Sequence, residues 1–137
     1  MGLKGNGRPE PGPAERRDAA VRAAVARGLV DEGHPVAGLL DVAGLRASAA
    51  ALRAAFEDVR TGGGQGVLHA FAVKAASLVP VLRLLADEGL GCEVASPGEL
   101  ALARAAGLPP GRIVLDSPAK TPAELREALA LGVAVNV

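Results

Sequence analysis

The ten residues 91–100, GCEVASPGEL, decide the fold class of this chain. GCEVAS (91–96) is a short apolar run bounded by glycine and proline, which is typical of a buried strand. SPGE (96–99) then fits a capping box, with serine at the N-cap, proline at the first helical position and glutamate at the third. The stretch therefore predicts a strand that leads directly into a capped helix.

The same unit recurs on both sides of this stretch. Its strands are VLHAFAVKA (67–75), GCEVAS (91–96), RIVLDS (112–117) and VAVNV (133–137). Each of the first three is followed by an apolar helical pattern that Ser77, Ser96 or Thr121 can cap. Gly89, Gly107 and Gly132 end these helices. Strands alternating with amphipathic helices predict β/α units on a parallel sheet with right-handed crossovers.

Two parallel architectures fit this pattern, an open doubly wound sheet and a (β/α) barrel. Both place ligand sites at the carboxyl ends of the strands. The residues expected at that rim are Lys74, Ser96, Asp116, Ser117 and Asn136. A dinucleotide-binding loop would follow a strand and open a helix, whereas TGGGQG (61–66) precedes a strand and is interpreted as a flexible loop.

The first half of the chain is less regular. Residues 1–12 are rich in Gly and Pro and are expected to be a disordered lead-in. Residues 13–66 are expected to hold two helices, the first starting at Pro13, with an extended segment HPVAGLLDV (34–42) between them. Residues 67–137 are expected to form four strands and three helices.

Composition excludes several classes of function. The 137 residues have zero formal net charge, two Phe and no Tyr or Trp, so they offer neither a basic patch nor stacking platforms for nucleic acid. No segment has the apolar length of a membrane helix, and the start lacks a signal peptide. The one cysteine, Cys92, fits a reducing cytoplasm, and a lone His69 with Cys92 does not make a metal site.

Lys74 ends the apolar strand pattern HAFAVKAAS (69–77) and allows two interpretations. A lysine at a strand end can extend its amine to solvent. Alternatively, Ala and Val neighbours could bury the amine and favour its neutral, nucleophilic form at the mouth of a barrel. Position alone does not decide between these.

Taken together, FAVKA, EVASPGEL, RIVLDSPAKTPAEL and GVAVNV resemble the N-terminal barrel part of the pyridoxal-phosphate decarboxylases of the diaminopimelate and ornithine type. The resemblance covers about residues 30–137. It implies an α/β fold: a truncated (β/α)8 TIM-type barrel related to alanine racemase, with about four β/α units.

The resemblance also implies roles for individual residues. Lys74 matches the catalytic lysine that binds pyridoxal 5'-phosphate covalently, and Glu93 matches an acidic position near that cofactor. For Glu93, an inward barrel charge paired with another side chain is an equal alternative. Ser96 is expected to be a helix cap, Lys120 a solvated loop lysine and His69 a structural or surface residue.

The chain departs from the family pattern in two respects. Ala76 stands where the family commonly has Asn two positions after the lysine. The phosphate loop, the acid facing the pyridine nitrogen and the partner subunit's contributions come later in the family than Val137. We therefore expect a fragment with negligible decarboxylase activity alone and a tendency to self-associate, whereas the intact family forms homodimers.

The implied function is decarboxylation of a small amino acid, with diaminopimelate favoured. An amino-acid racemase on the same barrel and a non-catalytic pyridoxal-phosphate-binding homologue remain open. No nucleic acid or membrane partner is expected.

Overall fold

A computed structural model describes residues 11–59 and 66–137 of the chain. The chain divides into two compact units, residues 1–45 and 46–137. Most of the predicted lead-in, residues 1–10, lies outside the described residues, as do residues 61–65 of the TGGGQG loop. Pro11 and Gly12 are described, and Gly12 is the N-cap of the first helix.

The first unit contains α1 (Pro13–Ala26), which begins at Pro13 as predicted. Its start is capped by the Glu15 carboxylate, which accepts a 2.8 Å hydrogen bond from the Gly12 amide. The segment HPVAGLLDV (34–42) forms no strand: residues 34–41 are exposed coil and Val42 begins α2 (Val42–Ala55). Asp41 caps α2 because its Oδ1 accepts a hydrogen bond from the Gly44 amide at 2.9 Å.

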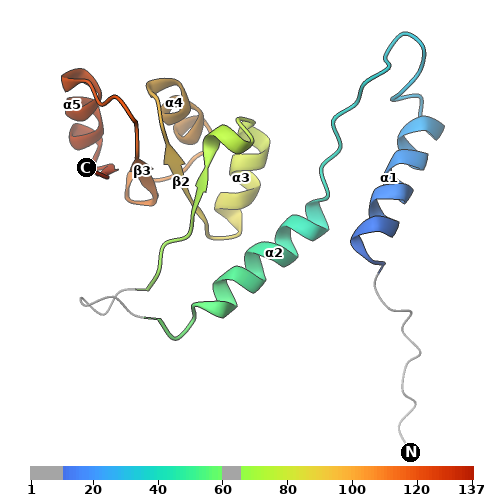
Figure 1. Ribbon diagram of the computed structural model, residues 1–137, viewed down its shortest axis with the longest axis horizontal. Coiled ribbons are helices and arrows are strands. Elements are labelled where there is room, and N and C mark those ends of the chain that lie inside the picture. Colours follow the sequence, from blue (N-terminus) through green and yellow to red (C-terminus); the bar gives the residue numbers. More distant parts are fainter. Residues whose placement is uncertain (1–10, 60–65) are drawn as a thin grey trace, which may run out of the picture. The chain divides into compact units, whose positions relative to one another are not determined.

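The second unit is built on a four-stranded sheet with the strand order β1-β2-β3-β4 (Figure 1). Its strands are β1 (Ala70–Ala72), β2 (Gly91–Val94), β3 (Ile113–Leu115) and β4 (Ala134–Val135), and every pair is parallel. The crossovers contain α3 (Val79–Asp87), α4 (Pro97–Ala105) and α5 (Pro122–Leu131), with the short 3-10 turn η2 (Pro110–Arg112) before β3.

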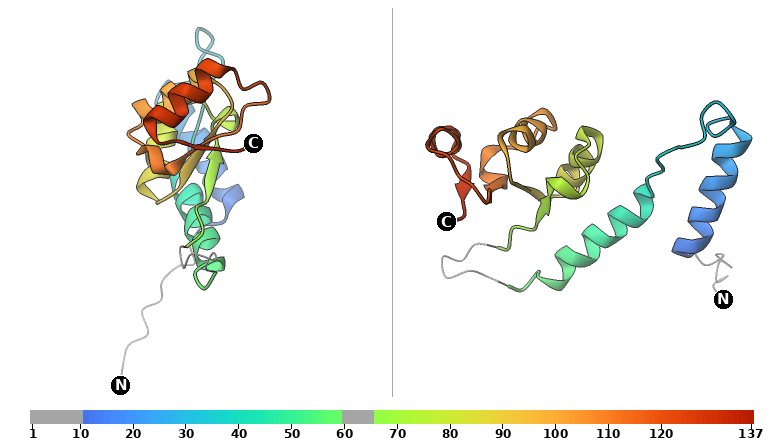
Figure 2. Two further views of the ribbon diagram at one scale, coloured as in Figure 1. Left: turned by 90° about the vertical axis from the view of Figure 1, so that its left-hand side faces the viewer. Right: turned by 45° about the horizontal axis from the view of Figure 1, so that its top comes forward.

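The strand order distinguishes between the two predicted architectures. A doubly wound sheet reverses its strand order at a switch point, whereas this sheet runs in consecutive order without reversal. Parallel strands in consecutive order, joined by right-handed crossovers, place all the helices on one face of the sheet. Figure 2 shows α3, α4 and α5 following one another along the sheet, from yellow to red. This is the arrangement of successive units in a (β/α) barrel.

The sheet has two different faces. We call the face that α3, α4 and α5 cover the helix face, and its strand residues form the core: Phe71, Cys92, Val94, Ile113, Leu115 and Val135. The opposite face, here the open face, carries the alternate residues, which the register aligns in one row: Ala72, Glu93, Val114 and Ala134. The core therefore lies between the sheet and its helices.

Local signals explain most helix boundaries. Thr121 and Glu124 form the predicted capping box of α5, and Ser96 Oγ accepts from the Glu99 amide at the start of α4. The second half of the α4 box differs from the prediction, because Glu99 Oε2 accepts from the Ala95 amide instead. The prediction for Ser77 is wrong: Leu78 is the N-cap of α3, and the Ser77 hydroxyl donates to the Val73 carbonyl.

Gly91 is required by the close approach of two strands. A Cβ atom at Gly91 would overlap the backbone carbonyl oxygen of Arg112, where β2 and β3 begin to pair. The backbone cannot move away without breaking the ladder that aligns Glu93 with Val114. Glycine at this position therefore permits the strand pairing that aligns the open-face residues.

Candidate functional site

Lys74 lies at the carboxyl end of β1, but not within the strand. The strand ends at Ala72, and Val73–Ala75 form the short 3-10 turn η1. The Val73 side chain is fully buried and anchors this turn in the core. The extended strand thus ends one residue before this turn, and Lys74 follows at the carboxyl end of β1.

Lys74 faces a carboxylate from the neighbouring strand. Lys74 Nζ lies 3.7 Å from Glu93 Oε1. Glu93 sits in the middle of β2 and its backbone pairs with Ala72 on one side and Val114 on the other. Glu93 therefore pairs with another side chain, as expected for the alternative of an inward barrel charge, and that partner is the candidate catalytic lysine.

The two charges differ in exposure. The Lys74 side chain is 64% exposed and that of Glu93 is 20% exposed. Of the two interpretations of Lys74, the exposure agrees with an amine that extends to solvent and not with one buried by Ala and Val neighbours. An exposed amine beside a fixed carboxylate remains accessible to a carbonyl compound.

A second lysine lies at the end of β3. Lys120 Nζ donates to the Ser117 carbonyl at 2.7 Å and lies 3.9 Å from Asp116 Oδ1. Its side chain is only 19% exposed, so the prediction of a solvated loop lysine is wrong. The signal was present in the sequence, since DSPAK (116–120) places an acid four residues before a lysine directly after a strand.

The other predicted rim residues have separate positions. Ser96 is engaged as the helix cap, as predicted, and Ser117 is buried, with its hydroxyl accepting from the Ala119 amide. The Asn136 amide donates to the Leu115 carbonyl, which extends the sheet beyond β4. Of the predicted rim residues, only Asp116 and Ser117 share a side-chain partner, because Lys120 contacts both.

Cys92 and His69 have structural environments. Cys92 is fully buried on the helix face, and burial raises the pKa of its thiol to about 11. The His69 ring packs edge-on against Phe56 with ring centroids 5.1 Å apart. No group of three metal-ligating side chains occurs within residues 11–59 and 66–137.

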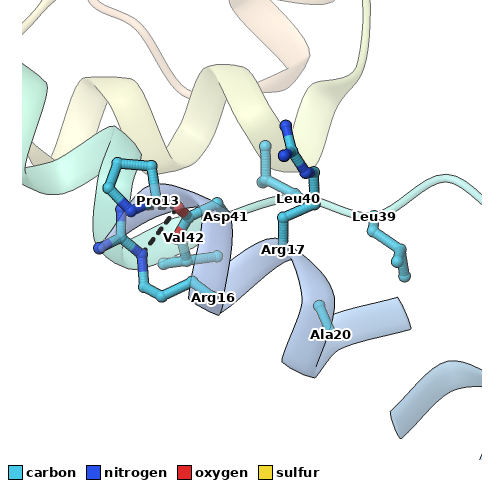
Figure 3. Close-up of a pocket in the computed structure, with 8 residues that line it drawn as sticks. All are labelled: Pro13, Arg16, Arg17, Ala20, Leu39, Leu40, Asp41 and Val42. Carbon is cyan, nitrogen blue, oxygen red and sulfur yellow. Dashed lines mark hydrogen bonds and ion pairs between the residues drawn. The ribbon is translucent and has the colours of Figure 1, made fainter. Parts of the chain in front are cut away.

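A cavity of about 410 Å³ lies entirely within the first unit (Figure 3). Arg16 closes one end of it by pairing with Asp41, with 2.9 Å between Arg16 Nη2 and Asp41 Oδ2. The hydrogen bond from the Gly44 amide, followed by that from Arg16, lowers the pKa of Asp41 below its usual value. The cavity contains none of the predicted site residues.

The fold and the Lys74–Glu93 pair define a class: parallel β/α proteins with a lysine at the carboxyl end of a strand, paired with a carboxylate from the next strand. The family described as "Pyridoxal-dependent decarboxylase, pyridoxal binding domain" matches residues 49–137. This chain belongs to that family. The match begins within α2 and includes all four strands.

Individual relatives agree with the family. The chain is 41% identical over 95 residues to a diaminopimelate decarboxylase from Actinosynnema pretiosum, covering 69% of this chain and 20% of that protein. A diaminopimelate decarboxylase from Zymomonas mobilis is 46% identical over 79 residues, covering 57% of this chain and 19% of the relative. This chain thus spans about a fifth of the length of these relatives.

A solved structure supports the barrel. A crystal structure of a diaminopimelate decarboxylase variant from Helicobacter pylori, complexed with L-lysine, superposes with a TM-score of 0.57 at 31% identity. The superposition covers 67% of this chain and 22% of that protein. The predicted fold, part of a (β/α)8-type barrel, is confirmed. Among the helices of the described residues, none is long and apolar enough to cross a membrane.

Proposed function

We propose that this chain provides the first strands and the cofactor lysine of a pyridoxal-phosphate-dependent amino-acid decarboxylase, with diaminopimelate as the favoured substrate. The observation that carries the proposal is the placement of Lys74 at the carboxyl end of β1, exposed and 3.7 Å from the Glu93 carboxylate. The family match and the diaminopimelate decarboxylases among the relatives support it.

The residues at this site fit an aldehyde cofactor. Lys74 offers an exposed primary amine, the group that attaches to pyridoxal phosphate. Ala72 on β1 pairs with Glu93 in the open-face row and carries only a methyl group, so we infer that this end of the row has room for a flat ring. When bound, pyridoxal phosphate supplies a ring that accepts the electron pair released as a carboxylate leaves as carbon dioxide.

Glu93 has a distinct role in this proposal. Its carboxylate lies 3.7 Å from the Lys74 amine and attracts it, which keeps the amine close to the open face. The pairing of β2 with both neighbouring strands fixes the Glu93 backbone. We therefore propose that Glu93 orients the lysine and that Lys74 provides the covalent attachment.

The proposal is tested by titrating the chain with pyridoxal phosphate and following the absorbance of the attached cofactor. Wild type is expected to give a saturable signal, which Lys74→Arg loses because a guanidinium keeps the charge without a nucleophilic amine. Glu93→Gln is expected to keep the signal but weaken binding by about threefold to fivefold, the scale of a partly exposed ion pair. Equal titrations of wild type and Lys74→Arg would contradict the assignment.

Substrate preference is tested on the loaded chain. Diaminopimelate, ornithine or lysine is added, and the change in absorbance reports displacement of Lys74 from the cofactor. Diaminopimelate is expected to act at the lowest concentration. An equal response to all three would contradict the preference for diaminopimelate and leave only the amino-acid class.

A further inference from the structure

Besides the Lys74–Glu93 pair, the carboxyl ends of the strands carry a second charged pair, Asp116 and Lys120. Lys120 is held at two points: its Nζ donates to the Ser117 carbonyl at 2.7 Å and lies 3.9 Å from Asp116 Oδ1. Its side chain is 19% exposed, compared with 64% for Lys74. Lys120 is therefore sequestered, while the Asp116 side chain remains 46% exposed.

The backbone places Asp116 on the open face. The Asp116 amide donates to the Val94 carbonyl at 2.9 Å, so the ladder between β2 and β3 continues past Leu115. Asp116 is two residues after Val114, and alternate residues of an extended strand share a face. Asp116 therefore lies on the same face as Glu93, two residues nearer the carboxyl ends of the strands.

Asp116 is close enough to act on a ligand at Lys74, but not on the Lys74 amine itself. The distance between β1 and β3 is two strand spacings, about 10 Å. A ring with a phosphate attached at Lys74 spans much of that distance. An uncompensated carboxylate at Asp116 would repel such an anion, and the repulsion is weakened only partly by salt over this distance.

We propose that Lys120 is a positioning residue that restrains and neutralises Asp116, so that the rim accepts an anionic aldehyde at Lys74. This inference rests on the proposed function, because it takes Lys74 as the attachment point. The Lys120 charge offsets that of Asp116, and its hydrogen bond to the Ser117 carbonyl holds it in place. Because both partners hold its ammonium group, Lys120 does not itself attack the aldehyde.

The experiment measures the rate at which pyridoxal phosphate with borohydride labels Lys74, determined by mass spectrometry. Lys120→Met is expected to slow labelling about threefold, because it leaves the Asp116 charge bare. Lys120→Arg is expected to retain the wild-type rate. The double variant Asp116→Asn with Lys120→Met is expected to return to within about twofold of wild type, because the repelling charge is gone.

Two controls distinguish an effect of the lost Lys120 charge from an effect of a changed loop structure. Formaldehyde with borohydride methylates Lys74 without bringing an anion, so its rate at Lys74 is expected to be equal in all variants. Raising the salt concentration is expected to shrink the Lys120→Met deficit for pyridoxal phosphate. A double variant as slow as Lys120→Met, or an equal loss with formaldehyde, would overturn the inference and leave Lys120 as a structural tie to Ser117.

Failure of the proposed function gives a different result. If pyridoxal phosphate does not label Lys74 in wild type, the proposed function fails. 4-Carboxybenzaldehyde, an aldehyde whose ring carries a negative charge away from the amine, then decides the inference through the same variants. Slower labelling of Lys74 by this aldehyde in Lys120→Met, restored in the double variant, supports the neutralising role. Unchanged labelling by this aldehyde contradicts it.

Discussion

The two faces of the sheet use the same strands for different purposes. On the helix face, Cys92, Val94 and Ile113 are at most 1% exposed. On the open face, the same strands carry Glu93 and the partly exposed Val114. The comparison shows that burial against α3, α4 and α5 stabilises the fold. The open face contributes less burial and can therefore carry a charged side chain such as Glu93.

The largest expected effect comes from one substitution made on each face. Val94→Ala removes two methyl groups from the fully buried helix face and is expected to lower the free energy of unfolding by about 2 kcal/mol. Val114→Ala, the matched change on the open face, is expected to cost less than about 1 kcal/mol. Urea denaturation of both variants checks this. Equal losses would mean that the two faces are equally buried in solution.

A smaller effect is expected from Cys92 at high pH. Burial raises the pKa of this thiol from 9.0 to about 11, so the folded chain retains the proton that the unfolded chain releases. The free energy of unfolding is therefore unaffected below about pH 8 and falls between pH 9 and 11, by about 1.4 kcal/mol at pH 10. The Cys92→Ala variant is the control, and the same fall in that variant would show that other groups cause it.

The smallest effect on stability is expected at the Lys74–Glu93 pair. Ion pairs with a largely exposed member contribute at most about 1 kcal/mol, and Lys74 is 64% exposed. Glu93→Gln is therefore expected to change the free energy of unfolding by less than about 0.5 kcal/mol while it weakens cofactor attachment. A decrease of several kcal/mol in the free energy of unfolding would mean that Glu93 stabilises the fold, and it would contradict the proposed difference between the two faces.

The fold was predictable because its signals are local. Capping residues such as Thr121 and stop glycines such as Gly132 act within one helical turn, and the structure confirms both. The choice of a barrel over a doubly wound sheet was not predictable from pattern, because strand order is a long-range property. The resemblance to known decarboxylases supplied it.

The site was predictable only in part. The resemblance identified Lys74 and Glu93, and the strand register explains why they meet. The exposure of Lys74 could not be decided from the sequence, because an apolar pattern does not show where a strand turns into a 3-10 helix. The prediction for Lys120 was wrong because the acid four residues before it suggests a pair, whereas its burial depends on how the loop after β3 folds back on the Ser117 carbonyl.

The most direct measurement of the central claim uses the small number of lysines in the chain. The sequence has three lysines, Lys4, Lys74 and Lys120. Wild type is treated with less than one equivalent of pyridoxal phosphate, reduced with borohydride and mapped by peptide mass spectrometry. We predict that the label is concentrated on Lys74 and nearly absent from Lys120. A label distributed evenly over the three lysines, or concentrated on Lys4, would contradict the claim that the open face carries the cofactor site.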